Sequence, residues 1–171
     1  RAATWGQLRA SGWQSLPVEI ADPSDVTIDD IAGVVRSRTR NRFALVAIDY
    51  LGLLRHTLEM SRRDLHEQVG YITRAAKMLA RTAKCVVILL AQVTREGNKR
   101  DAKITMHDLK GGGSIESDAD VVMIVQKGSD GEANTVLEVA AARSGRPGEQ
   151  AMHFDRSRGQ FKEVNRAQNI M

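Results

Sequence analysis

The stretch FALVAIDYLGLL, residues 43–54, decides the fold class of this chain. Its first part, Phe43 to Ile48, is apolar at every position and too short for a helix, which is typical of a strand buried on both faces. The same pattern returns in CVVILLAQ, residues 85–92, and again at Val121 to Gln126. Because helical patterns separate the first two runs and precede them, we expect an α/β domain with a largely parallel sheet.

Two helices and one further strand are expected before the run at residue 85. Thr27 is placed to cap a helix, with Asp30 three residues later as its reciprocal partner. Ser61 is the expected N-cap of a longer helix that runs to about Ala83. A short first strand is expected at Val18 to Ala21.

The last third of the chain reads as antiparallel hairpins at one edge of the sheet. The turn-rich segments KGSDGEAN (127–134) and DRSRGQ (155–160) each separate two runs with the alternation of strands. The expected strands of this region are Val121 to Gln126, Thr135 to Ala142, Gln150 to Phe154 and Phe161 to Val164. The polar stretch 94–103 has no apolar periodicity and is expected to be a mobile surface loop.

Length and composition restrict the class of protein. The chain has 171 residues, 25 Lys plus Arg and 21 Asp plus Glu, which fits one domain (1–164) and a short tail (165–171). No run approaches the roughly 18 apolar residues needed to cross a membrane, so we expect a cytoplasmic protein. The single cysteine, Cys85, excludes a disulfide framework and is expected to be a buried residue of the strand Cys85 to Ala91. The chain starts at Arg1, in mid-pattern, and we expect it to be a fragment.

Polar residues follow two of the buried strands directly. Asp49 follows the first run and Gln92 follows the second, so adjacent parallel strands would bring both to one edge of the sheet. A carboxylate there can hold Mg²⁺, and an amide can orient water beside a nucleoside triphosphate. The alternative is that both side chains simply bond to neighbouring loops.

Two further segments carry candidate binding residues. Gly111 to Gly113 follow Lys110, and exposed glycine amides beside a lysine can bind phosphate oxygens; a plain turn before a short helix is the alternative. Arg143 and Arg146 flank a tight turn after a strand, where an arginine can be presented to a neighbouring subunit's nucleotide. The alternative for both arginines is a solvated hairpin.

Four segments together resemble one family. They are AIDYLGLL (47–54), ILLAQVTR (88–95), MHDLKGGGSIESDADVVM (106–123) and AARSGRPGEQAMHFD (141–155). In order and spacing they look like the successive motifs of the RecA-like motor domain of DnaB-type replicative helicases, a P-loop NTPase core. The resemblance covers the chain from about residue 17, and SIESDADVVM is its most specific part.

The resemblance implies a role for each candidate residue. Asp49 falls on the Walker B aspartate that organises Mg²⁺, and Gln92 falls on the glutamine that senses the γ-phosphate of ATP. Lys110, Gly111 and Gly113 fall in the loop that holds a phosphate of single-stranded DNA. Arg143 falls on the arginine finger, and Arg146 would also face the nucleotide. The implied assembly is a hexameric ring, and a primase or a helicase loader is an implied partner.

The chain departs from the family pattern in three ways. It has Lys110-Gly111-Gly112 where members usually have Arg-Glu-Ser, and we expect the extra glycines to loosen the loop. Ala141 replaces a lysine that usually stands two residues before the finger. The sequence contains no GxxxxGK[ST], so we expect the N-terminal part of the core to be missing and this chain alone to hydrolyse ATP poorly or not at all. The alternative function is a truncated, non-catalytic module for nucleic-acid binding or assembly.

Overall fold

The computed structural model describes residues 17–38, 44–94, 103–128 and 134–164. These residues fall into two compact units. The helical unit contains residues 24–123 and 139–147, and the sheet unit contains the described parts of 1–23, 124–138 and 148–171. All the candidate site residues lie in the helical unit.

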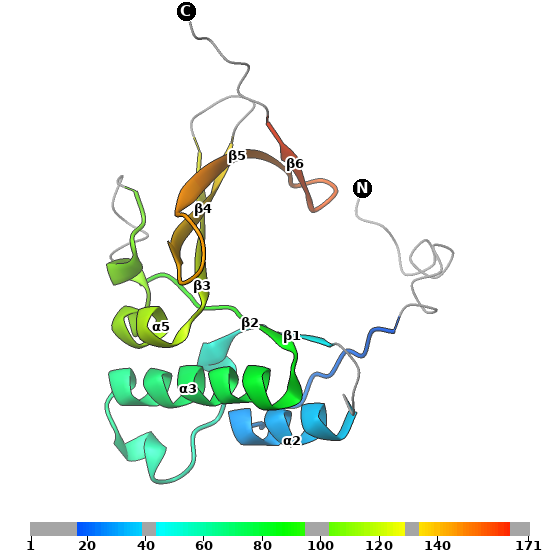
Figure 1. Ribbon diagram of the computed structural model, residues 1–171, viewed down its shortest axis with the longest axis vertical. Helices are drawn as coiled ribbons and strands as arrows, with labels where there is room; N and C mark the ends of the chain where they lie inside the picture. The colour runs from blue at the N-terminus through cyan, green and yellow to red at the C-terminus, as the bar shows by residue number, and fades with distance from the viewer. Residues whose placement is uncertain (1–16, 39–43, 95–102, 129–133, 165–171) are drawn as a thin grey trace, which may run out of the picture. The chain divides into compact units, whose positions relative to one another are not determined.

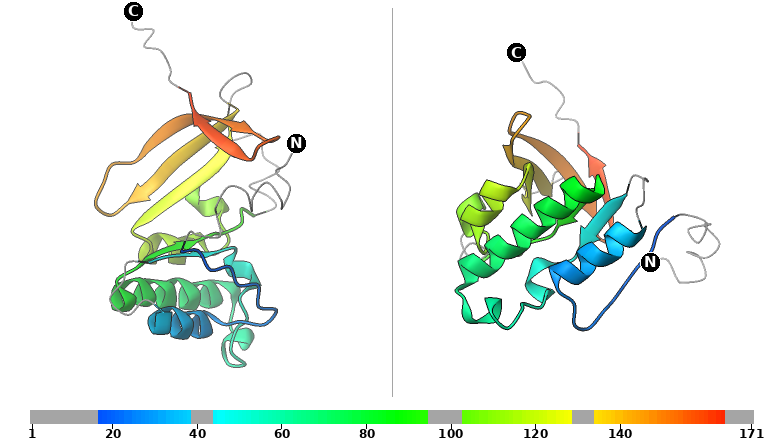
Figure 2. Two further views of the ribbon diagram at one scale, coloured as in Figure 1. Left: turned by 90° about the vertical axis from the view of Figure 1, so that its right-hand side faces the viewer. Right: turned by 60° about the horizontal axis from the view of Figure 1, so that its bottom comes forward.

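Two parallel strands and two helices form the core of the helical unit. Strand β1 (Leu45–Ile48) pairs in parallel with β2 (Val86–Leu89), with Ile48 opposite Leu89. Helices α2 (Ile28–Arg38) and α3 (Leu65–Ala83) lie side by side on one face of this pair (Figures 1 and 2). The side chains buried between these layers are Ile28, Ile48, Leu51, Leu54, Val69, Ile72 and Ala76. The predicted α/β class is confirmed.

Burial of the two strands differs from the sequence prediction. Val46 and Val87 pack toward the helices, whereas Leu45 is 58% exposed and Ile88 is 40% exposed. The prediction that both faces are covered is therefore wrong for the described residues of this unit, because α2 and α3 both lie on the same face. An uninterrupted apolar run indicates that a strand is hydrophobic, but it does not indicate how many of its faces the neighbouring elements cover.

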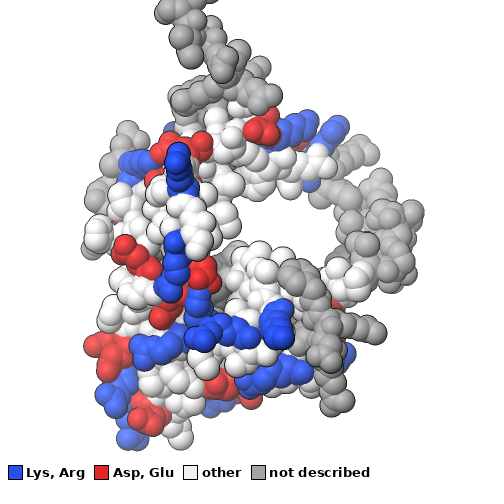
Figure 3. Space-filling model, viewed as in Figure 1, with Lys and Arg blue, Asp and Glu red and all other residues white. Residues whose placement is uncertain are grey.

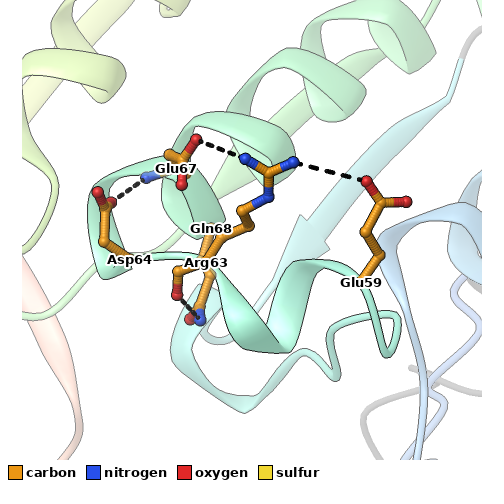
Figure 4. A network of polar contacts seen from close by, with 5 residues as sticks. All are labelled: Glu59, Arg63, Asp64, Glu67 and Gln68. Atoms are coloured by element: carbon orange, nitrogen blue, oxygen red, sulfur yellow. Dashed lines mark hydrogen bonds and ion pairs between the residues drawn. The ribbon is translucent and has the colours of Figure 1, made fainter.

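The start of α3 also differs from the prediction. Asp64, not Ser61, is the N-cap: its carboxylate accepts a hydrogen bond of 2.8 Å from the Glu67 backbone N–H (Figure 4). Ser61 lies in a separate short 3-10 helix, Met60–Arg62, and the backbone becomes extended at Arg63. Because of this extended residue, the turn that contains Ser61 is not part of α3. The prediction that the helix begins after Ser61 was therefore wrong.

The cap of α2 is confirmed, but the strand expected before it is not. The Thr27 hydroxyl accepts from the Asp30 N–H at 3.2 Å, and the Asp30 carboxylate accepts from the Thr27 N–H at 2.9 Å. The Thr27 hydroxyl also donates to the Asp30 carboxylate at 2.7 Å, and this bond, with a smaller contribution from the Thr27 N–H, lowers the pKa of Asp30. Val18 to Ala21 is not a strand: Val18 and Ile20 are 59% and 79% exposed, and the segment pairs with no described strand.

The remaining strands form a four-stranded sheet in the order β3-β4-β5-β6. Their bounds are Val121–Lys127, Thr135–Ala142, Gly148–Asp155 and Gln160–Glu163, each within two residues of the prediction at either end. The hairpin β5–β6 is antiparallel as expected, and its Phe154 and Phe161 rings stack at 4.5 Å between centroids. Residues 95–102 and 165–171, which include most of the predicted surface loop and the tail, lie outside the described residues.

Two further predictions concern burial and membranes. Cys85 is 8% exposed, as expected, although it lies immediately before β2 and not within it, and its burial raises the pKa of the thiol. Among the described residues, no helix has the length and apolar character to cross a membrane.

Candidate functional site

Asp49 and Gln92 lie at the same edge of the parallel pair. The register places Ile48 opposite Leu89, so Asp49 directly follows β1 at the end where the chain leaves β2. The pairing continues past the strands, because the Leu90 N–H donates to the Ile48 carbonyl at 3.0 Å and the Leu51 N–H donates to the Leu90 carbonyl at 2.9 Å. Both candidate side chains are exposed at this edge, where a ligand can reach them. The Asp49–Tyr50 peptide bond is cis.

A short antiparallel ladder joins Gln92 to Lys110. Val93 forms a bridge with Leu109, and the Thr94 N–H donates to the Asp108 carbonyl at 2.6 Å. The Lys110 N–H donates to the Gln92 carbonyl at 3.4 Å. Main-chain bonds therefore couple the residue after β2 to the loop that carries the lysine. The sequence contained no signal for this pairing, because the two segments are separated by the polar stretch 94–103.

Gln92 and Lys110 also line one cavity of about 210 Å³. Its wall comes from the segment after β1 and from the first half of α3, and the other lining residues are Tyr50, Leu51, Gly52, His56, Leu65, Gln68, Val69 and Ile72. Nδ1 of His56 is buried and has no hydrogen-bond partner among the described residues. Sequence reasoning did not single out His56 or Gln68, since neither belongs to a recognisable motif.

The glycines after Lys110 fit a tightly packed turn. Gly111 has a φ of +75°, and a Cβ there would lie 2.6 Å from Cγ1 of Val69. A Cβ at Gly112 would lie 2.3 Å from the Met106 carbonyl oxygen. At Gly113 the nearest atom is at 3.5 Å, an ordinary contact. The expectation that the glycines loosen the loop is therefore wrong, because two of the three are needed for close packing before helix α5 (Gly112–Asp118).

The backbone amides of this turn divide into two sets. The Lys110 N–H bonds to Gln92, and the Gly112 N–H donates to the Leu109 carbonyl at 3.0 Å. The N–H groups of Gly111 and Gly113 make no hydrogen bond with any described residue. Both donors follow Lys110 in the same turn, and the Lys110 residue is exposed. The turn thus presents one cation and two amide donors to an anion.

Arg143 occupies a separate corner of the helical unit. Its Nη2 donates to the Ser117 carbonyl at 2.9 Å, and its Nε lies 3.9 Å from Oδ1 of Asp120. Lys77 from α3 forms an ion pair with the same oxygen of Asp120. The Lys77 ammonium lowers the pKa of Asp120, with a smaller contribution from Arg143. The Lys77–Asp120 link was missed from sequence because the two residues are 43 positions apart.

Arg143 therefore contacts α5 and Asp120 rather than Asp49, Gln92 or Lys110. The Arg143 side chain is 55% exposed, which leaves its guanidinium accessible to a ligand. Arg146 is exposed in the turn after β4 and forms no hydrogen bond or ion pair with the described residues. The structure thus places the candidate residues at two sites, the sheet edge with the Lys110 turn and the Arg143 corner.

A metal site made wholly of protein ligands is not found in the part of the chain that the structure describes. No group of three or more His, Cys, Asp or Glu side chains gathers there. Asp49 alone fits the manner in which Mg²⁺ usually binds, through one or two carboxylates with water and phosphate oxygens as the other ligands.

The parallel pair with polar residues at its C-terminal edge, the helices on its face and the antiparallel strands that follow define a RecA-like ATPase fold. A search against family models matches residues 3–163 to the DnaB-like helicase C terminal domain. This chain belongs to that family.

Similar proteins agree with this assignment. The replicative DNA helicase DnaB of Geobacillus stearothermophilus is 28% identical over 172 residues, which cover 95% of this chain and 38% of that protein. DnaB of Leifsonia xyli is 34% identical over 130 residues, which cover 75% of this chain and 27% of that protein. A probable replicative DNA helicase of Trieres chinensis is 33% identical over 160 residues, which cover 86% of this chain and 35% of that protein. The chain thus spans less than two-fifths of the length of these relatives.

Two solved structures share the fold. One shows a DnaB-like replicative helicase and its interactions with primase; it superposes with a TM-score of 0.83 at 25% identity, covering 94% of this chain and 42% of that one. The other is the ATPase domain of a second protein. It superposes with a TM-score of 0.82 at 27% identity and covers 94% of this chain and 60% of that one.

Proposed function

We propose that this chain forms the C-terminal portion of an ATP-dependent replicative helicase that moves along single-stranded DNA. The observation that carries the proposal is the backbone ladder between Gln92 and Lys110. It connects the edge of the sheet, where a nucleotide would bind, to the turn where DNA would bind. A shift of one segment would be transmitted to the other, since main-chain bonds at both ends of the ladder move together.

Asp49 and Gln92 are the residues proposed to face ATP and Mg²⁺. The Asp49 carboxylate, exposed after β1, would hold the magnesium ion, and the Gln92 amide would bond to the terminal phosphate. Bound Mg²⁺ supplies charge neutralisation of the phosphates during their transfer to water. The backbone carbonyl of Gln92 accepts a hydrogen bond from the Lys110 N–H, and this bond would hold Gln92 in place. The Gln92 side chain and Lys110 would therefore move together when ATP binds or is hydrolysed.

The turn at Lys110 is the proposed DNA contact. The lysine supplies a positive charge, and the free N–H groups of Gly111 and Gly113 can each donate to a phosphate oxygen. Because the turn is held by the packing of Gly111 and Gly112, these donors are already oriented before DNA binds. Such contacts do not read bases, so binding would be independent of sequence.

Arg143 is proposed to serve the nucleotide of an adjacent subunit in a hexameric ring. It lies away from Asp49 and has an accessible guanidinium, as a residue acting on a neighbour's site requires. To reach that nucleotide it would exchange Ser117 and Asp120 for phosphate oxygens, with Arg146 beside it. A primase or a helicase loader would be a further partner, as one similar structure shows primase with its helicase.

We further propose that the 171 residues alone are deficient in ATP hydrolysis, since the sequence has no phosphate-binding loop. Steady-state measurement should give no turnover above that of an Asp49→Ala variant. Turnover that disappears in that variant would contradict this part of the proposal. In the gene, a strand followed by GxxxxGK[ST] is expected upstream of the codon for Arg1, and a start codon there would contradict the helicase proposal.

DNA binding by the turn is tested with a labelled oligo(dT) in fluorescence anisotropy. Lys110→Ala should weaken binding about tenfold at low salt and lower the slope of log affinity against log salt by about 0.7. The matched control is Lys103→Ala, an exposed lysine in the same region that precedes the capped turn at Thr105. Equal affinity of Lys110→Ala and the unmodified chain would contradict the proposed role of the turn.

A further inference from the structure

Helix α3 has a charge distribution that the proposed sites do not use. From Gln68 to Cys85 the sequence contains no acidic residue but four cations. Arg74, Lys77 and Arg81 are three and four residues apart and therefore share one side of the helix, and Lys84 caps its end. We call these four residues the basic face of α3. Figure 3 shows a row of Lys and Arg side chains along the level of this helix.

Most of these charges are free. Arg74, Arg81 and Lys84 are exposed and form no ion pair with any described residue. Lys77 is 26% exposed and paired with Asp120. The other acidic side chain beside this face, Asp118, accepts a hydrogen bond of 2.5 Å from Thr73. The basic face thus carries a clear excess of positive charge, because within the described part of the chain a single carboxylate, that of Asp120, pairs with one of its four cations.

Helix α2 adds a cation to the same end of the unit. The two helices run in the same direction, since Tyr71 of α3 bonds to Asp29 near the start of α2, and Ala32 further along packs with Leu79. The last turn of α2 therefore lies beside the last turns of α3. Its Arg36 is exposed and has no ion pair with the described residues.

The spacing of these charges fits a nucleic-acid backbone. At about 1.5 Å per residue, Arg74 to Lys84 spans about 15 Å of helix. Within a duplex, one DNA strand carries a phosphate about every 3.4 Å, so this span matches about four phosphates of a strand in that stacked conformation. The face offers no aromatic ring for stacking, because Tyr71 is turned to Asp29 on α2. Contacts would therefore be to phosphates and would not depend on base sequence.

We propose that the basic face of α3 is a second DNA-binding surface that holds the phosphate backbone independently of the Lys110 turn. Its cations come from the outer side of a well-packed helix, whereas the turn lies at the edge of the sheet. The proposal does not depend on the role assigned to Lys110, and the two can fail separately.

The test is anisotropy of the unmodified chain and of an Arg74→Gln, Arg81→Gln double variant with labelled oligo(dT). Gln keeps the helix propensity and the length of the side chain. Affinity should fall about tenfold at low salt, and the salt slope should decrease by about 1.4 because two phosphate contacts are lost. The matched control, Arg156→Gln with Lys162→Gln, removes the same charge from the β5–β6 hairpin and should change neither quantity.

Four outcomes decide the proposal. An unchanged affinity and slope in the α3 variant would overturn it, as would an equal loss in the hairpin control, which would indicate net charge alone. Losses that add when the α3 changes are combined with Lys110→Ala would support two separate surfaces. If Lys110→Ala has no effect while the α3 variant loses affinity, the proposed binding of DNA by the basic face is supported and the proposed role of the turn is contradicted. Circular dichroism of each variant verifies that α3 remains folded.

Discussion

The Lys110 turn and the Arg143 corner both present cations to a ligand, but they are held by different forces. The turn is fixed by main-chain hydrogen bonds to Gln92 and by glycines that have no room for a side chain. At the corner the Arg143 N–H also donates to the Asp120 carbonyl at 2.8 Å, but the Arg143 side chain is held by an ion pair and a hydrogen bond that are exposed to solvent. The comparison teaches that the proposed DNA contact is preorganised, while the proposed finger is held by bonds that a competing anion can replace.

Substitution in the turn should give the largest loss of stability. Gly112→Ala would force a Cβ to within 2.3 Å of the Met106 carbonyl oxygen. Such overpacking should lower the free energy of unfolding by about 2–3 kcal/mol, measured by urea denaturation. Gly113→Ala is the matched control, because its Cβ meets only an ordinary contact at 3.5 Å, and its change should stay within about 0.5 kcal/mol. Equal effects of the two would mean that the turn is not tightly packed.

A double-mutant cycle between Gly111 and Val69 tests whether the turn is tightly packed. Gly111→Ala should cost about 2 kcal/mol from the clash with Val69 and from the positive φ. In a Val69→Gly background the clash is relieved, because this change also removes the Val69 Cβ that would lie 2.7 Å away, so the cost of Gly111→Ala should become smaller by about 1 kcal/mol. Strictly additive changes in urea denaturation would show that the strain is in the backbone alone.

An intermediate effect is expected where α3 meets α5 beside the corner. Thr73 is 8% exposed, and its hydroxyl donates to Asp118 at 2.5 Å. Thr73→Val removes this donor, and we expect a loss of about 1 kcal/mol in the free energy of unfolding. Thr82→Val is the control, since the Thr82 hydroxyl is exposed and bonds only within its own helix. A loss at Thr82 as large as that at Thr73 would contradict this account.

The smallest effect, with the strongest dependence on pH and salt, is expected at Asp120. Because the Asp120 side chain is 63% exposed, Asp120→Asn should lower the free energy of unfolding by only about 0.5 kcal/mol at neutral pH. The pKa of Asp120 in the folded chain lies below its ordinary value of 3.8, so its ion pairs stabilise the fold above that pH. The stabilisation is lost as the pH falls through the lowered pKa.

The measurement compares chemical denaturation of the unmodified chain and the Asp120→Asn variant across this pH range and at low and high salt. The difference between them should shrink in acid and in high salt. A difference that persists in acid would show that Asp120 acts through packing instead of charge.

Local features of the sequence predicted much of the fold. The capping pair Thr27–Asp30 was recognised because its partners are three residues apart, and the strands near residues 45, 86, 121 and 135 were recognised from short apolar runs. The beginning of α3 was wrong, because Ser61 and Asp64 are both good N-caps and only the extended backbone at Arg63 selects between them. Val18 to Ala21 was wrong because a strand needs a partner that its own residues cannot specify.

By itself the sequence determined that Asp49 and Gln92 follow neighbouring strands, since both depend on local order along the chain. Only the tertiary structure decided what surrounds them. It joined Gln92 to Lys110 across the intervening loop, made Gly111 and Gly112 a requirement of packing against Val69 and Met106, and brought Lys77 and Arg143 to one oxygen of Asp120. The physical reason is that these contacts join residues far apart in the chain, and such pairings have no periodic signature in the sequence.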